Sequence, residues 1–162
     1  MTEIEKRMHR VCFTGHRPEK LIRNEKIIKK DLEKQIHRAI ADGLDVFVTG
    51  MARGVDIWAA ETVLRLRNAG KAIRLICACP YQGFEQGWGK EWQEQYRKIL
   101  AAADLVKYIS PSYSRSCFQI RNEWMVDHAA RVIAVFNGEK SGTKNTIDYA
   151  KKVGVPVILL DG

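Results

Sequence analysis

Glycine, hydroxyl and arginine residues gather just after segments that have the pattern of β-strands. The segment Val46–Gly50 (VFVTG) continues with Arg53, Gly54 and Asp56 before a helical pattern begins, and TGHRP at Thr14–Pro18 has the same character. Ligands of open parallel sheets bind beyond the carboxyl ends of the strands. Glycine lets backbone N–H groups approach a phosphate, arginine adds a bidentate cation, and a helix N-terminus adds partial positive charge. These residues predict a phosphate or nucleotide site, with plain turn chemistry as the alternative.

The same reasoning extends to NGEKSGTKNT, which follows the apolar run VIAVF, and to RNEWM, which lies in a helical pattern. Two side chains have open alternatives. His16 either contacts a phosphate or acts as an acid, or it makes a hydrogen bond that stabilises its turn. Asp56 either binds a ribose or caps the helix that follows it. The expected ligand site comprises Thr14, Gly15, His16, Arg17, Gly50, Arg53, Gly54, Asp56, Arg121, Asn122, Gly142, Thr143, Asn145 and Thr146.

Two common nucleotide motifs are missing. The chain has no GxGxxG after its first strand and no GxxxxGK[ST] loop. Ordinary dinucleotide oxidoreductases and P-loop enzymes are therefore disfavoured. The loop Pro80–Lys90 (PYQGFEQGWGK) offers another feature, because Tyr81, Phe84 and Trp88 can stack on the bases of a nucleic acid, stack on one adenine, or pack as a lid.

These loops must be positioned by alternating strands and helices. The pattern predicts a Rossmann-like, doubly wound α/β fold in which helices cover both faces of a parallel sheet, formed as a single domain over residues 1–162. Continuous apolar strands such as VIAVF and VPVILL favour a sheet covered on both faces. The expected strands are Arg10–Thr14, Leu44–Thr49, Ala72–Cys79, Asp104–Ile109, Arg131–Phe136 and Val155–Leu160. The expected helices extend from an Asn24 cap to about Asp42, and over Val55–Ala69, Glu91–Ala102, Phe118–Ala130 and Thr143–Val153.

Composition narrows the class of partner. The 162 residues are 46% hydrophobic and 28% charged, with a net charge of +8. This charge favours anionic partners such as nucleotides or nucleic acid, with a solvated basic surface as the alternative that charge alone does not exclude. No apolar stretch is long enough to span a bilayer, and the charged N-terminus has no signal core, so we expect a cytoplasmic protein with no membrane partner. Cys12, Cys77, Cys79 and Cys117 form no CxxC pair, which favours buried free thiols and no metal site.

Four segments together resemble a known bacterial family. FTGHRP at Phe13–Pro18, TGMARGVDIWAAE at Thr49–Glu61, RNEWMVDHA at Arg121–Ala129 and SGTKNTIDYA at Ser141–Ala150 are similar to the YpsA-like (DUF1273) family of the SLOG superfamily. That superfamily also contains the LOG phosphoribohydrolases and DprA. The resemblance covers nearly the whole chain, and it implies a Rossmann-like fold that binds a nucleotide or a nucleotide derivative such as an ADP-ribose-like ligand.

The resemblance implies a sensing or regulatory role better than an enzymatic one. The hydrolases pair an RKxxM helix with PGGxGTxxE. Arg121 and Met125 match the first motif, and Gly142 and Thr143 match the second, but Thr146 occupies the position of the glutamate. We therefore lean against N-glycosidic hydrolysis, which stays open as one alternative. Single-stranded nucleic-acid binding of the DprA type is the other. Domains of this superfamily often pair through helices, which favours a homodimer.

Overall fold

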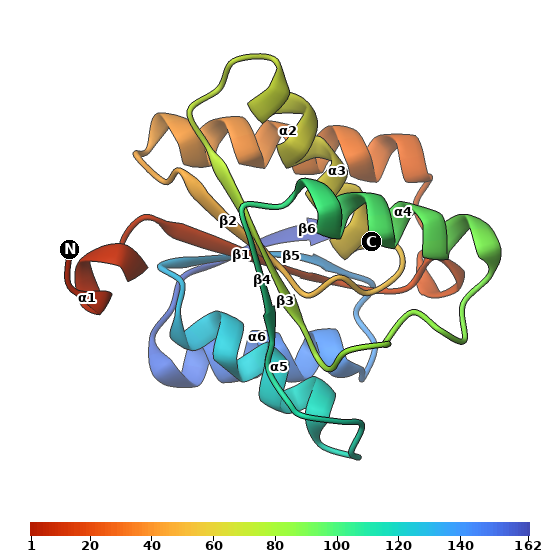
Figure 1. The fold of residues 1–162 in the computed structure, drawn as a ribbon. Helices are drawn as coiled ribbons and strands as arrows, with labels where there is room; N and C mark the ends of the chain where they lie inside the picture. The colour runs from red at the N-terminus through yellow and green to blue at the C-terminus, as the bar shows by residue number, and fades with distance from the viewer.

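A six-stranded parallel sheet organises the molecule. The computed structural model describes residues 1–162. The sheet order is β4-β3-β2-β1-β5-β6, and each neighbouring pair is parallel (Figure 1). This arrangement confirms the Rossmann-like α/β fold. The strands are β1 (Arg10–Gly15), β2 (Val46–Thr49), β3 (Arg74–Cys79), β4 (Leu105–Tyr108), β5 (Arg131–Phe136) and β6 (Val157–Asp161).

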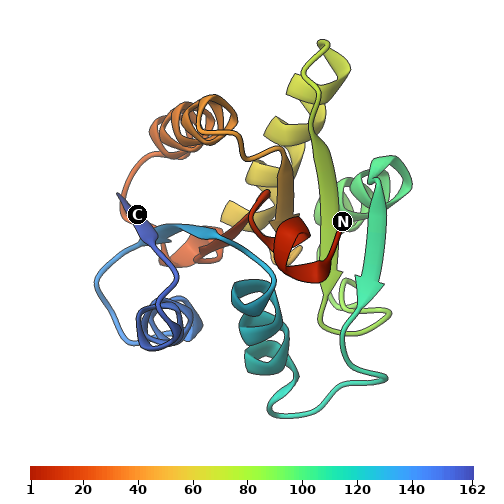
Figure 2. The ribbon, with the colours of Figure 1, turned by 90° about the vertical axis from the view of Figure 1, so that its left-hand side faces the viewer.

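Helices cover both faces of this sheet. α2, α3 and α4 lie on one face, and α5 and α6 lie on the other (Figures 1 and 2). The chain changes face where α5 leads from β4 back across the sheet to β5. The helices are α1 (Glu3–Arg7), α2 (Glu25–Ala41), α3 (Val55–Asn68), α4 (Lys90–Ala102), α5 (Cys117–Asp127) and α6 (Gly142–Val153), with a 3₁₀ turn η1 (Pro18–Lys20).

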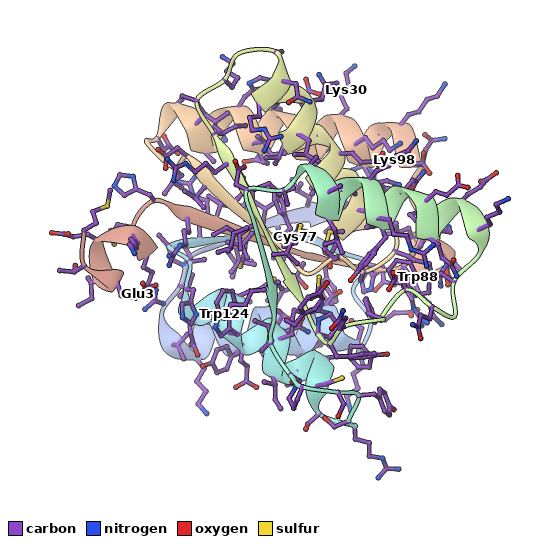
Figure 3. The ribbon with its side chains drawn as sticks, viewed as in Figure 1. Glu3, Lys30, Cys77, Trp88, Lys98 and Trp124 are labelled. Carbon is purple, nitrogen blue, oxygen red and sulfur yellow. The ribbon has the colours of Figure 1, made fainter.

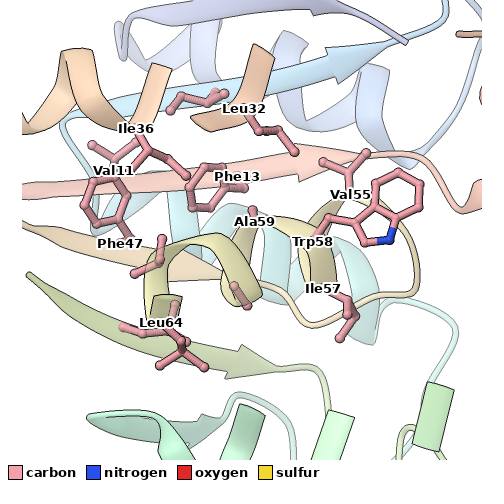
Figure 4. Close-up of a cluster of buried hydrophobic side chains, with 14 of the residues drawn as sticks. Val11, Phe13, Leu32, Ile36, Phe47, Val55, Ile57, Trp58, Ala59 and Leu64 are labelled. Carbon is pink, nitrogen blue, oxygen red and sulfur yellow. The ribbon is translucent and has the colours of Figure 1, made fainter. Parts of the chain in front are cut away.

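Alternation along the central strands separates two hydrophobic cores. Phe13 and Phe47 pack with α2 and α3 in the larger core of 25 buried residues (Figure 4). Their neighbours Cys12 and Val48 point to the other face, into a core of 12 buried residues that includes Met125 of α5. Successive strand residues face opposite sides of a sheet, so each of the four central strands β1, β2, β3 and β5 contributes to both cores.

Three of the four cysteines belong to these cores, Cys12 to the smaller one and Cys77 and Cys79 to the larger one. Cys12, Cys77, Cys79 and Cys117 are all free and buried, as the sequence predicted. Burial raises the pKa of the Cys12, Cys77 and Cys79 thiols, which disfavours the reactive thiolate.

Several expected element ends differ from the structure. β2 begins at Val46 because the Leu44 N–H donates to the Ala39 carbonyl and closes the end of α2 instead. β6 begins after Pro156, which has no N–H to donate to a ladder. The prediction that VPVILL is covered on both faces is wrong, because β6 is an edge strand and Leu159 is 55% exposed.

Other differences concern the end of one helix and two short helical segments that were not expected. α5 ends at Asp127, before the expected Ala130, and the sequence pattern did not reveal α1 or η1. α1 begins with a capping box in which Thr2 and Glu5 bond each other's backbone N–H groups. None of the helices combines the length and the apolar character needed to cross a bilayer.

Candidate functional site

A pocket of about 650 Å³ lies at the carboxyl edge of the sheet, around the switch point between β1 and β5. There the chain leaves β1 toward one face and leaves β5 toward the other, which opens a crevice for a ligand. Ten of the fourteen expected site residues line this pocket. They are Thr14, Gly15, His16, Arg17, Arg53, Asp56, Arg121, Asn122, Gly142 and Thr143.

His16 joins the loops after β1 and β5. Its Nε2 accepts a hydrogen bond of 3.0 Å from the Asn137 N–H, and its ring stacks on Phe136 with centroids 5.8 Å apart. Nε2 must be unprotonated to accept this bond, so the neutral ring carries its proton on Nδ1. Burial lowers the pKa of His16, which favours the same neutral state. The loop-stabilising alternative for His16 is thus present, and the side chain also lines the pocket.

Asp56 and Arg121 form the buried floor of the pocket. Asp56 is 5% exposed and Arg121 is also 5% exposed. The Arg121 guanidinium donates to the Gly50 carbonyl and, through Nε at 2.8 Å, to the Asn122 side chain. A Cβ on Gly50 would lie 2.9 Å from the Arg121 guanidinium and 3.0 Å from Asp56 Oδ2. Gly50 does not line the pocket, but it leaves space for the two charged groups that do.

The Asp56 carboxylate is only partly satisfied. Oδ2 accepts from the Ala52 N–H at 3.2 Å, whereas the buried Oδ1 has no hydrogen-bond partner. Gly54 is the N-cap of α3, so Asp56 is not the capping residue that the sequence left as an alternative. Burial raises the pKa of Asp56 to about 6, although the positive charge of Arg121 acts in the opposite direction. A buried acceptor without a donor is costly, and a ligand hydroxyl or amine that reached this oxygen would remove that cost.

The turn after β2 uses part of its backbone donors within the chain. Three of its N–H groups are used within the chain: Met51 donates to Thr49 Oγ1, Ala52 to Asp56 Oδ2 and Val55 to the His16 carbonyl. The N–H groups of Gly50, Arg53 and Gly54 make no hydrogen bond within the chain. Gly54 has a φ of +91°, and a Cβ there would lie 2.6 Å from the His16 carbonyl oxygen. Gly54 therefore allows two loops of the chain to approach each other. That Gly54 also brings this turn close to a ligand stays a prediction.

Arg53 is also partly committed to the chain. Its guanidinium pairs with Glu19 in η1 at 2.6 Å, and its side chain is 23% exposed. The hydrogen bond from Arg53 lowers the pKa of Glu19. Arg53 lines the pocket, but it is a bridge between two loops and not a free cation.

The N-terminus of α6 presents unused donors to the pocket. Ser141 Oγ caps the Lys144 N–H at 3.2 Å, and the N–H groups of Gly142 and Thr143 make no hydrogen bond within the chain. A Cβ on Gly142 would meet no atom within 4 Å, so the fold itself does not demand glycine at this position.

Two expected residues of α6 lie outside the pocket. Thr146 is fully buried, and its hydroxyl donates to the Gly142 carbonyl at 2.9 Å. Asn145 is exposed on the helix. The first turn of α6 is therefore the part of this motif that reaches the site.

Sequence reasoning missed several polar residues of the pocket. Lys20, Asn137, Glu139, Lys140 and Ser141 follow β1 or β5 and line it. Their position directly after a strand is the signal in the sequence that points to them. Across the chain, no group of three or more His, Cys, Asp or Glu side chains is placed to hold a metal ion.

The other end of the pocket is aromatic. Phe84, Trp88 and Phe118 line it, and we call these three residues the aromatic wall. Figure 3 shows Trp88 in the long loop that leads to α4. Tyr81, which the sequence grouped with Phe84 and Trp88, does not line the pocket, but it contacts Phe84 with ring centroids 5.7 Å apart.

A second hollow lies outside this pocket, between α2 and α3. Its volume is about 1010 Å³, and its surface is mainly charged. Lys26, Lys30 and Lys34 form no ion pair, whereas Glu33 pairs with Arg65 and Asp31 pairs with Arg23. We call this hollow the α2–α3 groove; its lining comprises Lys26, Lys29, Lys30, Asp31, Glu33, Lys34, His37, Trp58, Glu61, Thr62 and Arg65.

Comparison with known proteins identifies the family. The model of the YspA SLOG family matches residues 11–154, which include the larger core and the whole pocket. The chain belongs to the YspA SLOG family. The chain is also similar to a UPF0398 protein of Bacillus thuringiensis strain Al Hakam and to one of Bacillus cereus strain AH187. Each is 30% identical over 157 residues, covering 89% of this chain and 83% of the relative.

Solved structures show the same fold. DNA processing protein A of Helicobacter pylori, known for its single-stranded DNA binding mode, matches with a TM-score of 0.68 and 22% identity, over 99% of this chain and 68% of that one. DNA processing protein A of Streptococcus pneumoniae matches with a TM-score of 0.69 and 22% identity, over 96% of this chain and 51% of that one. The Moco carrier protein of Chlamydomonas reinhardtii has a TM-score of 0.54 and 18% identity.

Within this SLOG domain, some of the residues that resemble the hydrolase motifs line the pocket, and the others are buried away from it. Arg121 is in the pocket floor, and Gly142 and Thr143 are at its α6 end. Met125 is 1% exposed and belongs to the smaller core. Thr146 faces its own helix backbone, so it brings no catalytic group to the pocket.

Proposed function

We propose that the pocket binds a nucleotide or a nucleotide derivative in a sensing or regulatory role. The observation that carries this proposal is that unpaired backbone N–H groups in the first turn of α6 lie in the same pocket as several cationic side chains. The N–H groups of Gly142 and Thr143 have no partner in the chain, and Arg17, Lys20 and Lys140 line the same pocket. Unpaired helix N–H groups with nearby cations form an anion site, so this end suits a phosphate.

The pocket floor adds a second polar contact. Asp56 Oδ1 lacks a donor and is suited to accept a hydrogen bond from a ribose hydroxyl. Arg121 stays buried nearby and balances part of the carboxylate charge. A ligand with a phosphate and a sugar therefore satisfies two features that the chain leaves incomplete. Membership of the SLOG family and the fold shared with DNA processing protein A support a nucleotide-related ligand.

Gly142 offers a direct test of the phosphate contact. Gly142→Val adds a side chain beside the free N–H groups, where the fold has open space. We expect calorimetric titration to show AMP or ADP-ribose binding to the unaltered protein, and at least tenfold weaker binding to the variant, since one lost charge-assisted hydrogen bond has about that effect. The matched control is Gly89→Val before α4, because Gly89 has an ordinary φ of −59°, a Cβ there would meet no atom within 4 Å, and Gly89 does not line the pocket. Equal affinity of the unaltered protein and Gly142→Val for both ligands would place the phosphate elsewhere.

Single-stranded nucleic acid is a second candidate ligand because of the α2–α3 groove. Three lysines without ion pairs, Lys26, Lys30 and Lys34, recur at four-residue spacing and so share one side of α2. Like charges at this spacing destabilise an isolated helix by a few tenths of a kcal/mol per pair, and a polyanion would relieve that repulsion. α2 begins shortly after Lys20, so this cationic side starts close to the pocket.

Nucleotide hydrolysis has one feature in its favour and one against it. The raised pKa of Asp56, about 6, suits a general base. The glutamate of the hydrolase motif, however, is replaced by Thr146, which is buried against Gly142. We expect no release of adenine from AMP when the reaction is followed by chromatography. Turnover that Arg121→Ala abolishes would instead establish the enzyme.

A further inference from the structure

We propose that the aromatic wall stacks on the base of the bound nucleotide. The site would then select a nucleobase-containing ligand over a sugar phosphate alone. This inference rests on the proposed function, because it assigns the end of the pocket that the phosphate and sugar do not use. The shared chemistry is a nucleoside phosphate, which either a free mononucleotide or one unit of a single strand can supply.

The wall belongs to a connected aromatic cluster that is only partly buried. Phe84 contacts Trp88 with centroids 5.0 Å apart and Phe118 at 5.6 Å, and Trp88 contacts Tyr96 at 5.3 Å. Tyr96 is 1% exposed and anchors the cluster in the larger core. The three wall residues are instead partly exposed where they line the pocket. They therefore offer apolar ring surface that the chain itself does not cover, which suits the flat face of a base.

The loop that holds the wall is already ordered by hydrogen bonds. Gln93 of α4 donates through Nε2 to the carbonyls of Trp88 and Gln86, at 2.9 and 3.0 Å. Within the loop, the Trp88 N–H donates to the Glu85 carbonyl, and the Gln86 N–H donates to the Gly83 carbonyl. Packing and these bonds hold the rings in place before any ligand arrives, so stacking would cost little ordering of the loop.

The order of the strands places the three proposed ligand contacts in a row: the aromatic wall for the base, Asp56 for the sugar and the first turn of α6 for the phosphate. Phe84 and Trp88 follow β3, Asp56 follows β2, His16 and Arg17 follow β1, and the first turn of α6 follows β5. Adjacent strands are about 4.8 Å apart, so the β3 and β5 ends are roughly 14 Å apart. A simple anion at α6 would not reach the wall. A nucleoside phosphate has its sugar between its base and its phosphate, as Asp56 lies between the wall and α6.

The test compares ligands with and without a base. Calorimetric titrations would use AMP, ribose 5-phosphate and a short oligothymidylate on the unaltered protein and on Phe118→Leu, which keeps an apolar side chain and removes the ring. Phe84→Leu is the second variant, and Tyr113→Leu is the control, because Tyr113 contacts Phe118 but does not line the pocket. Thermal melts establish that each variant is folded.

We expect the unaltered protein to bind AMP more tightly than ribose 5-phosphate. Phe118→Leu should weaken AMP binding by about five- to a hundredfold, as expected for one lost stacking contact, and should leave ribose 5-phosphate binding unchanged. If oligothymidylate binds and loses affinity in the same variant while AMP does not bind at all, the base belongs to a single strand.

Two results would overturn the inference. If AMP binds to Phe118→Leu and Phe84→Leu as tightly as to the unaltered protein, the wall is only structural packing, and the proposed nucleotide site still stands. If none of the three ligands binds to the unaltered protein, the proposed function fails and the inference fails with it.

Discussion

Gly54 lies where the turn after β2 meets the turn after β1. Its φ of +91° and the closeness of the His16 carbonyl both exclude a side chain. The glycine and arginine residues after β2 predicted a site at the carboxyl edge of the sheet, and the pocket lies at that edge. They did not reveal that Gly54 contacts the chain and that Arg53 pairs with Glu19, because both roles depend on residues more than thirty positions away.

Gly54→Ala should therefore reduce stability more than an alanine at a comparable glycine. Gly43 is the control, since its φ is +90° and a Cβ there would meet nothing within 4 Å. A left-handed alanine costs about 1–2 kcal/mol at either site, and the 2.6 Å contact adds to that cost only at Gly54. Thermal melts should show the lower Tm for Gly54→Ala. Equal melting temperatures would mean that the loops separate without cost.

Asp56 should make the affinity for a nucleotide fall as the pH is lowered. Only the ionised carboxylate accepts a ligand hydroxyl through both oxygens, and burial raises its pKa to about 6. Affinity for AMP should be constant above about pH 7 and should fall below pH 6, by up to about tenfold per unit. The phosphate of AMP also titrates near pH 6, so Asp56→Asn serves as the reference. If the unaltered protein and Asp56→Asn have the same pH profile, Asp56 does not contact the ligand.

At the scale of elements, the loops after β1 and β5 are held together by His16 and Asn137. Periodicity and apolar runs predicted all the strands and the five longer helices to within a few residues. The contact between these two loops could not be predicted, because His16 and Asn137 are 121 positions apart and meet only when β5 pairs with β1. That pairing also brings Lys20 and Lys140 to one pocket.

The His16–Asn137 bond should make stability depend on pH. The ordinary pKa of histidine is 6.5, and burial lowers the pKa of His16 in the folded state. Between these values the unfolded chain binds more protons, so the stability that neutral His16 provides is complete above 6.5 and is lost as the pH falls toward the lower, folded pKa. Asp56 and Glu61, whose pKa values are raised, act in the opposite direction, so only a comparison with a variant isolates His16.

The measurement is the difference in Tm between the unaltered protein and His16→Ala from pH 7.5 to pH 5. We expect a loss of about 1 kcal/mol for the variant at pH 7.5, the usual contribution of one hydrogen bond. The difference should shrink on acidification. His37→Ala, at an exposed position of α2, is the control. A difference that stays constant over this range would exclude neutral His16 as the source of the loop contact.

At the scale of the whole molecule, the sheet order decides which residues can share a ligand. The sequence predicted a doubly wound sheet, but the order β4-β3-β2-β1-β5-β6 depends on long-range pairing that no local pattern contains. This order places the aromatic wall and α6 at opposite ends of one pocket. It also places the α2–α3 groove on the face of the sheet that α2 and α3 cover, with a lining that shares no residue with the pocket.

The charge of the α2–α3 groove separates the two candidate ligands. Lys30→Glu with Lys34→Glu reverses two unpaired cations on α2 that do not line the pocket, so AMP affinity should stay unchanged. Binding to a polyanion depends on released counterions, and each lost phosphate contact on a single strand lowers the slope of log affinity against log salt by about 0.7. The double variant should therefore bind labelled oligothymidylate more weakly in fluorescence anisotropy, with a slope smaller by about 1.4. Lys98→Glu with Lys90→Glu on α4 is the control for the change in net charge. Identical salt slopes for the unaltered protein and the α2 variant would exclude the groove as a path for nucleic acid, because phosphates lying along it must contact these lysines.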